Sequence, residues 1–246
     1  MELLISLIFA AGLARLGGKH MQMLNWPLYG AGAVFAFTAC LAYLLTLQDK
    51  VLKTGAGVGH ILAVCDNGTL GTAFFIVVMF GAVLPRHWDL RKNIMRARGE
   101  LSILGGVVLL PHLFHYVIDT LLHLDRFKAM EGMAFWTFTM MVLLGLYAGA
   151  IFIPLWVTSF PRVRKKLKGK RWKNIQRHAY LFYAFVYLHV MLAYALHPEP
   201  TYAFASCLYT LLFAAYLTLR FQKRTREVVR LVVMALKTKG GIHDRS

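Results

Sequence analysis

The fold of this chain is decided by residues 171–197, which read RWKNIQRHAYLFYAFVYLHVMLAYALH. The stretch begins basic and aromatic, then becomes an apolar helix of membrane-spanning length, since about 20 apolar residues cross the hydrocarbon core of a bilayer. Three histidines, His178, His189 and His197, interrupt it. Imidazole in hydrocarbon is costly unless something binds it, so these histidines predict a functional site.

The composition indicates an integral membrane protein. The 246 residues are 58% hydrophobic, and the mean hydropathy is +0.55. Apolar runs predict an all-α bundle of six membrane-spanning helices, at about residues 27–47, 61–84, 101–121, 133–157, 175–196 and 202–219. Together with their loops these spans make one domain, residues 21–220. Residues 1–20 and 221–246 are expected to form amphipathic interfacial helices at the two termini, the second as a basic cytoplasmic tail.

The distribution of positive charge predicts the orientation. The formal net charge is +17, with 28 Lys and Arg. All of these residues lie in the N-terminal segment, the 85–98 loop, the 161–177 loop or the region from Arg220 onward, except Lys50, Lys53, Arg126 and Lys128. The positive-inside rule therefore predicts a multi-pass protein of a prokaryotic cell membrane, with both termini cytoplasmic. This juxtamembrane charge favours membrane lipids over nucleic acid as its partner.

Two histidines are expected at the same depth in two parallel spans. His112 lies 11 residues after Leu101, and His189 lies 14 residues after Ile175. At 1.5 Å per residue the two positions differ in depth by only about 4–5 Å. Two imidazoles from separate helices suit the axial positions of heme b, whereas zinc would need a third or fourth ligand. The alternative for each residue is a core histidine that is bonded to a backbone carbonyl.

Other polar residues near the spans have less specific interpretations. His178 is a further candidate cofactor ligand near the inner interface, and Arg98 could neutralise a heme propionate there. His115 is expected to be a hydrogen-bonding neighbour of His112. His123 and His197 match in depth at the outer rim and could frame an external site.

Asp66 lies in the outer turn of the second span, together with Asn67. It could contact a proton or a substrate. The interpretation we favour from the sequence is a side chain that snorkels to the membrane interface.

Two motifs resemble those of the ferric reductase-like transmembrane domain family. One is Arg98-Gly99-Glu100-Leu101-Ser102-Ile103 followed by His112, and the other is Lys170-Arg171-Trp172-Lys173-Asn174-Ile175-Gln176 followed by Tyr180 and His189. The resemblance covers about residues 86–220. The family includes the heme-binding membrane subunit of the bacterial methionine sulfoxide reductase system.

The resemblance implies that His112 and His189 ligate the outer heme b. The inner ligand positions fall on Gln176 and Arg98, which departs from the family pattern. A second heme is therefore not expected unless His178 has taken over one of these positions. The resemblance also implies an electron-transfer subunit that lacks its own flavin and nicotinamide domains. A flavin or quinone donor at the cytoplasmic interface and an extracytoplasmic redox partner protein would complete the system.

The sequence thus favours a b-type cytochrome subunit that passes electrons outward across the membrane. One alternative is a self-contained reductase of ferric or other metal ions, or of quinones. Another, of a different class, is a non-redox transporter or assembly scaffold that uses the histidines for protons or packing.

Overall fold

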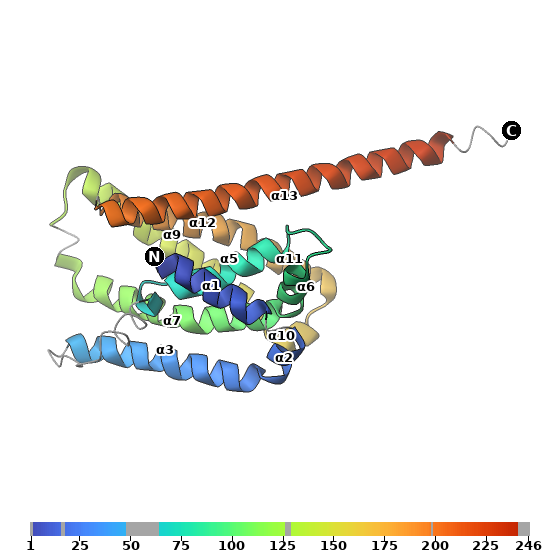
Figure 1. The fold of residues 1–246 in the computed structure, drawn as a ribbon. Coiled ribbons are helices and arrows are strands. Elements are labelled where there is room, and N and C mark those ends of the chain that lie inside the picture. Colours follow the sequence, from blue (N-terminus) through green and yellow to red (C-terminus); the bar gives the residue numbers. More distant parts are fainter. Residues whose placement is uncertain (1, 16–17, 48–63, 126–128, 198, 241–246) are drawn as a thin grey trace.

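The computed structural model describes residues 2–15, 18–47, 64–125, 129–197 and 199–240, and their fold is all-α (Figure 1). The helices that it defines are α1 (Glu2–Arg15), α2 (Gly18–Met23), α3 (Asn25–Leu47), α5 (Thr69–Gly81), α6 (Asp89–Arg96), α7 (Arg98–Leu122), α9 (Gly132–Val157), α10 (Pro161–Lys166), α11 (Gly169–Arg177), α12 (Ala179–Ala195) and α13 (Pro200–Gly240).

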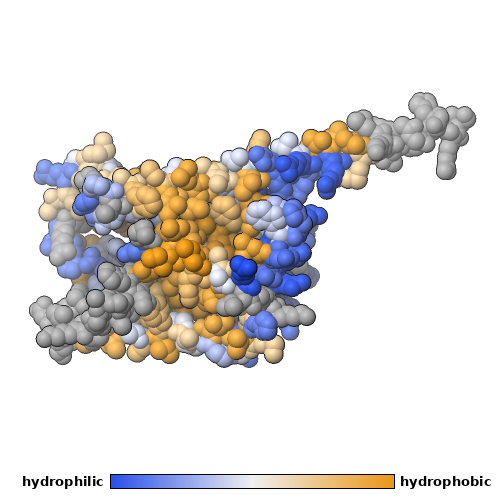
Figure 2. All heavy atoms as spheres, in the orientation of Figure 1, coloured by the Kyte–Doolittle hydropathy of each residue, from blue (hydrophilic) through white to orange (hydrophobic). Residues whose placement is uncertain are grey.

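Within the described residues, five helical stretches are long and apolar enough to cross a membrane, so the chain is a multi-pass membrane protein. They are Asn25–Leu45, Arg98–Leu122, Gly132–Val157, Gly169–Ala195 and Tyr202–Met234. The second predicted span, 61–84, is represented by the shorter helix α5, of 13 residues, and residues 61–63 lie outside the described part. An apolar belt separates two more hydrophilic ends of the molecule (Figure 2). We call the end that carries α6, α10 and α11 the basic end.

The helices form two packed groups. In the first, α3 and α5 pack along α7, and α1 packs along α5; in the second, α9 packs along α12. Small residues allow the closest approach, between α5 and α7. A Cβ atom on Gly71 would lie 3.0 Å from the backbone oxygen of Gly105, and a Cβ atom on Gly105 would lie 2.7 Å from Cβ of Phe74. Such small-residue contacts let membrane helices pack backbone against backbone.

Helix α1 runs alongside α5 instead of lying across an end of the bundle, which differs from the interfacial placement expected for residues 1–20. Its buried residues are Leu3, Ser6, Ala10 and Ala14. Near its start, Asn67 Nδ2 donates a hydrogen bond to Glu2 Oε2 (2.6 Å). At its last residue, Asn93 Nδ2 donates to the Arg15 carbonyl (3.4 Å). The small residues at positions 6, 10 and 14 form one stripe on the helix, because residues four apart share a face.

Helix α13 is continuous from Pro200 through Gly240, so no break in the helix marks residue 221, where the sequence predicted that the tail begins. It extends well past the basic end of the bundle (Figure 1). Residues 201–239 contain no glycine and no proline, the two residue types that most strongly oppose a helix. Lys223 Nζ donates to the carbonyl of Ala82 (2.7 Å) just past the end of α5, so part of this extension contacts the bundle.

The α5–α7 contact predicts unequal effects of two glycine substitutions. Gly105→Ala should destabilise the protein by about 1–3 kcal/mol, the usual cost of overpacking, because the new methyl group would clash with Phe74. Gly149→Ala is the matched control on α9, where an added Cβ meets nothing within 4 Å. Thermal unfolding of both variants in detergent is the measurement, and equal unfolding temperatures would contradict the close approach.

Candidate functional site

His112 and His189 meet across the boundary between the two helix groups. His112 comes from α7 and His189 from α12. Their ring centroids are 6.3 Å apart, and the ring planes make an angle of 84°. The structure therefore brings together the two histidines that the sequence places at matching depth.

Each of the two rings is held by a backbone carbonyl from a third element. Nδ1 of His112 lies 2.9 Å from the carbonyl oxygen of Asp66, and Nδ1 of His189 lies 2.8 Å from that of Met141, in α9. A carbonyl oxygen only accepts, so Nδ1 must carry the proton. In a neutral imidazole the lone pair is then on Nε2, and the hydrogen bonds that the structure records for these two rings leave Nε2 available to a metal or another donor.

Glycines give both rings access to these carbonyls. A Cβ atom on Gly145 would lie 3.0 Å from Cε1 and Nδ1 of His189. Gly145 is one helical turn after Met141, so the missing side chain opens the face of α9 to the imidazole. Gly68 likewise leaves room for the ring of His112, since a Cβ atom added to Gly68 would lie 3.0 Å from Cγ of that ring. Its φ of 72° also favours glycine on backbone grounds.

Tight packing between the helices stops at the level of the histidine pair. In α7 the buried residues run from Leu101 to Pro111, and none follows His112. The buried residues of α9 are Ala148, Phe152 and Leu155, in its second half, and that of α12 is Phe182, seven residues before His189. From the histidines onward, away from the basic end, no side chain of these three helices is fully buried, although Leu113, Val190 and Met191 are partly buried against the core.

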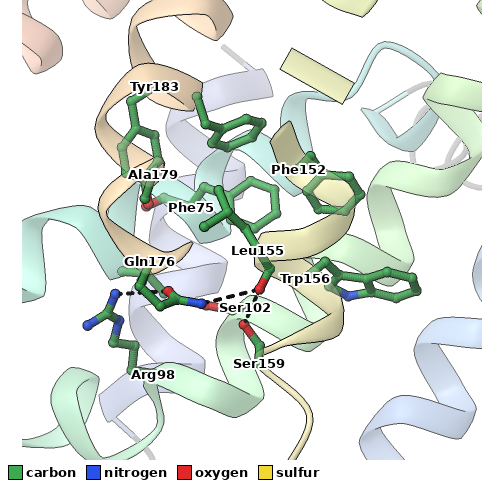
Figure 3. A pocket seen from close by; sticks show the side chains of 12 residues that line it. Phe75, Arg98, Ser102, Phe152, Leu155, Trp156, Ser159, Gln176, Ala179 and Tyr183 are labelled. Carbon is green, nitrogen blue, oxygen red and sulfur yellow. Dashed lines mark hydrogen bonds between the residues drawn. The ribbon is translucent and has the colours of Figure 1, made fainter. Parts of the chain in front are cut away.

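A second polar pair crosses the same boundary nearer the basic end. Arg98 Nη2 donates to Gln176 Oε1 over a long 3.5 Å, and Gln176 Nε2 donates to Thr158 Oγ1 at 3.1 Å. A cavity of about 40 Å³ lies beside them (Figure 3). Its lining includes the aromatic residues Phe75, Phe152, Trp156, Phe182 and Tyr183. Such a volume suits water molecules and not a planar cofactor.

Arg98 is too far from the histidine pair to serve it. It precedes His112 by 14 residues on the same helix, or about 21 Å along the axis. His178 is exposed, and its Nδ1 donates to the carbonyls of Asn174 and Ile175 within its own chain segment. It does not line the cavity beside Arg98. In the described part of the chain, the hydrogen bonds of Arg98 and His178 go to residues other than His112 and His189.

Asp66 has more contacts in the structure than the interpretation favoured from the sequence implied. Its carboxylate accepts a hydrogen bond from His115 Nδ1 at 2.5 Å, and its carbonyl holds His112. The snorkelling interpretation was thus incomplete, although the side chain stays 37% exposed. His115 bonds Asp66 instead of His112. The only signal in the sequence was a carboxylate in an apolar run, because the partners lie 46 and 49 positions away.

The two histidines expected at the outer rim have separate surroundings. His123 Nδ1 lies 2.9 Å from Asp119 Oδ1, on its own helix. His197 Nδ1 donates to the Ala193 carbonyl (2.9 Å). His197 also faces a cavity of about 330 Å³, whose lining does not include His123: Met191, Tyr194, Ala195, His197, Glu199, Tyr202, Ala203 and Ser206.

The chain is similar to an uncharacterized protein of Treponema pallidum, with 30% identity over 205 residues that cover 78% of this chain and 54% of the relative. It is also similar to magnetosome protein MamZ of Magnetospirillum gryphiswaldense, with 38% identity over 89 residues, 36% of this chain and 13% of that protein. MamZ of Paramagnetospirillum magneticum is 39% identical over 72 residues, 29% of this chain and 11% of that protein. The chain thus spans about half the length of the first relative and far less of the others. No protein-family model and no solved structure matches.

The hydrogen bonds predict one tautomer for both histidines. In cofactor-free protein, His112 and His189 should each carry the proton on Nδ1, because only that nitrogen faces a carbonyl. Nitrogen chemical shifts of ¹⁵N-histidine-labelled protein are the measurement, with His112→Gln and His189→Gln variants to assign the signals. A proton on Nε2 in either ring would contradict the arrangement.

Proposed function

We propose that this chain is a b-type cytochrome, a membrane subunit that carries electrons across the cell membrane with one heme b held between His112 and His189. The observation that carries the proposal is the pair of facing imidazoles, 6.3 Å apart, each bonded at Nδ1 to a backbone carbonyl. Metal-ligating histidines typically donate their other ring N–H in this way.

The separation of the rings fits axial ligation of a single metal ion. A metal–imidazole bond is about 2.0–2.1 Å long, and the ring centre lies about 1.1 Å beyond the bonded nitrogen. Two imidazoles on opposite sides of one metal ion therefore have ring centroids about 6 Å apart. A core histidine that binds no ligand can also donate from Nδ1 to a backbone carbonyl. That alternative does not account for two such rings at this distance from each other.

The surroundings favour a heme over a bare metal ion. Among the described residues, no group of three or more His, Cys, Asp and Glu side chains could hold a metal ion, and two imidazoles alone are too few ligands for zinc. A heme brings four nitrogen ligands of its own and needs only the axial positions. The incomplete packing of α7, α9 and α12 beyond the histidines suits a cofactor with a large apolar body.

A single heme is the proposed content. In the motifs that resemble the ferric reductase-like family, the inner ligand positions fall on Arg98 and Gln176, and here these side chains contact each other. The aromatic side chains around the 40 Å³ cavity fill the space beside them. His178 is exposed, so it does not supply a replacement ligand at this level.

The proposed topology has six passes, with α5 as the short second one, and the C-terminal end of α13 in the cytoplasm. The start of α1 lies beside Asn67, at the opposite end of the bundle, which departs from the cytoplasmic N-terminus expected from the sequence. The positive-inside rule puts the basic end at the cytoplasmic face; the cations expected on the other face, Lys50, Lys53, Arg126 and Lys128, lie outside the described residues. A cytoplasmic-side flavin or quinone would donate electrons, and an extracytoplasmic redox partner protein would accept them. The heme supplies one-electron chemistry, while the protein orients the ligands and excludes water.

Substitution of either ligand tests the proposal. Purified wild-type protein should show a heme b spectrum with a reduced α-band and about one heme per chain. His112→Ala and His189→Ala should each lose the low-spin spectrum, because one axial position opens.

His178→Ala and His197→Ala are the controls, since among the described residues the hydrogen bonds of both side chains go to backbone carbonyls of their own segment and not to the histidine pair. They should keep the wild-type spectrum. Colourless wild-type protein, or unchanged spectra in both ligand variants, would refute the assignment and favour a transporter or scaffold.

The cavity beside His197 supports a second candidate, a self-contained reductase of a small molecule. Its volume of about 330 Å³ lies at the lower end of the range for ligand pockets. If this candidate holds, chemically reduced protein should be reoxidised by a soluble quinone or a ferric chelate without any partner, and Tyr202→Ala should slow the reaction several-fold. Reoxidation by a partner protein alone would leave the electron-transfer subunit as the better proposal.

A further inference from the structure

We propose that Asp66 is a positioning residue that fixes His112 and thereby sets the reduction potential of the heme. This inference rests on the proposed function. It assigns a role to a carboxylate outside the ligand pair, on a segment that precedes α5.

Asp66 is attached to α7 at two points. Its backbone carbonyl accepts from His112 (2.9 Å), and its carboxylate accepts from His115 (2.5 Å). Residues three apart on a helix are neighbours on its surface. His112 and His115 therefore lie on one face of α7, and both bond to Asp66. The carboxylate contact thus restricts the position of the carbonyl that orients His112.

The ring of His115 is itself stacked against two tyrosines. Tyr43, from α3, stacks on it with centroids 3.9 Å apart and an interplanar angle of 30°. Tyr116 lies at 4.9 Å and 19°, and it also contacts His112 at 4.7 Å. Because two tyrosines confine the imidazole, the carboxylate of Asp66 has a partner that cannot swing away.

The residues that follow Asp66 hold the segment from the other side. Asn67 Oδ1 accepts from the backbone N–H of Thr69 at 3.0 Å, and Asn67 Nδ2 donates to Glu2 on α1. Gly68 packs against the His112 ring. The carbonyl of Asp66 is therefore set by contacts to α1, α3 and α7, not by local backbone preference alone.

A well-placed carbonyl makes His112 a stronger ligand. Donation of the Nδ1 proton to an acceptor raises the basicity of the ligating nitrogen. A more basic ligand favours ferric over ferrous iron, so the bond lowers the reduction potential. Loss of the Asp66–His115 contact should loosen the carbonyl and raise the potential.

The experiment compares Asp66→Ala and Asp66→Asn in the full-length, heme-loaded protein in detergent. Asp66→Ala should weaken heme retention about 10- to 100-fold, the usual effect of losing such a supporting group. It should also raise the midpoint potential, by about 59 mV for each tenfold change in the ferric-to-ferrous equilibrium. Asp66→Asn keeps an acceptor oxygen and should lie between Asp66→Ala and wild type.

His115→Phe and Asp119→Ala complete the design. His115→Phe keeps the stacked ring but removes the donor, so it should reproduce the rise in potential while Asp66 is intact. Asp119→Ala is the matched control: it also removes a carboxylate from a histidine on α7, His123, but that histidine does not contact His112 in the described structure. Because Asp119 is also close enough to Tyr43 and Tyr116 to act on them electrostatically, this variant measures the effect of the lost charge alone, and its shift in potential should be well below that of Asp66→Ala.

The outcomes separate the two proposals. If Asp66→Ala and His115→Phe lower the unfolding temperature but keep the wild-type potential and heme retention, the pair is only structural and the positioning role is refuted. The same conclusion follows if Asp119→Ala shifts the potential as much as Asp66→Ala does. Wild-type protein that binds no heme would instead overturn the proposed function, and the positioning role with it.

Discussion

Two hydrogen bonds, each from the imidazole of a histidine to a backbone carbonyl, fix the orientation of the two rings at the centre of this bundle. The Asp66 and Met141 carbonyls hold His112 and His189, and each takes up the one ring nitrogen that would otherwise compete as a ligand. Both depend on glycine, since Gly68 and Gly145 leave room for the rings. The two histidines keep Nε2 free of these bonds, their ring centroids are 6.3 Å apart, and they come from two different groups of helices. Any group bound between them would therefore join the two halves of the bundle.

The boundary between the helix groups carries two levels with different chemistry. At one level the imidazoles face each other, and interhelical packing is incomplete. At the other, nearer the basic end, Arg98 and Gln176 contact each other, and aromatic side chains leave only about 40 Å³. Trp156 Nε1 also donates to the Ile103 carbonyl across this boundary (3.0 Å), and Tyr183 donates to that of Phe75 (3.1 Å). The basic-end half is thus tied together by side-chain bonds to backbone carbonyls, while the other half has fewer fully buried side chains.

Membrane character and the matched depth of His112 and His189 were predictable from the sequence. Hydropathy and helical rise are local properties, and helices of similar direction convert residue counts directly into depth. The sequence did not reveal that Ser6, Ala10 and Ala14 of α1 are buried in the bundle. It also did not reveal that the last span and the tail form one continuous helix, because the change in charge near residue 221 drew more attention than the absence of helix-breaking residues in 201–239. The contacts of Asp66 with His112 and His115 were not predicted, because these partners lie 46 and 49 positions away in the chain.

The sequence by itself determined an all-α membrane protein with histidines inside its apolar segments, because composition and periodicity act within each helix. Only the tertiary structure decided which nitrogen of each ring remains available, that Arg98 pairs with Gln176, and that Asp66 links His112 to His115. These features depend on hydrogen bonds between residues 46 to 78 positions apart. The packing of whole helices sets such bonds, and no local pattern of residues specifies them.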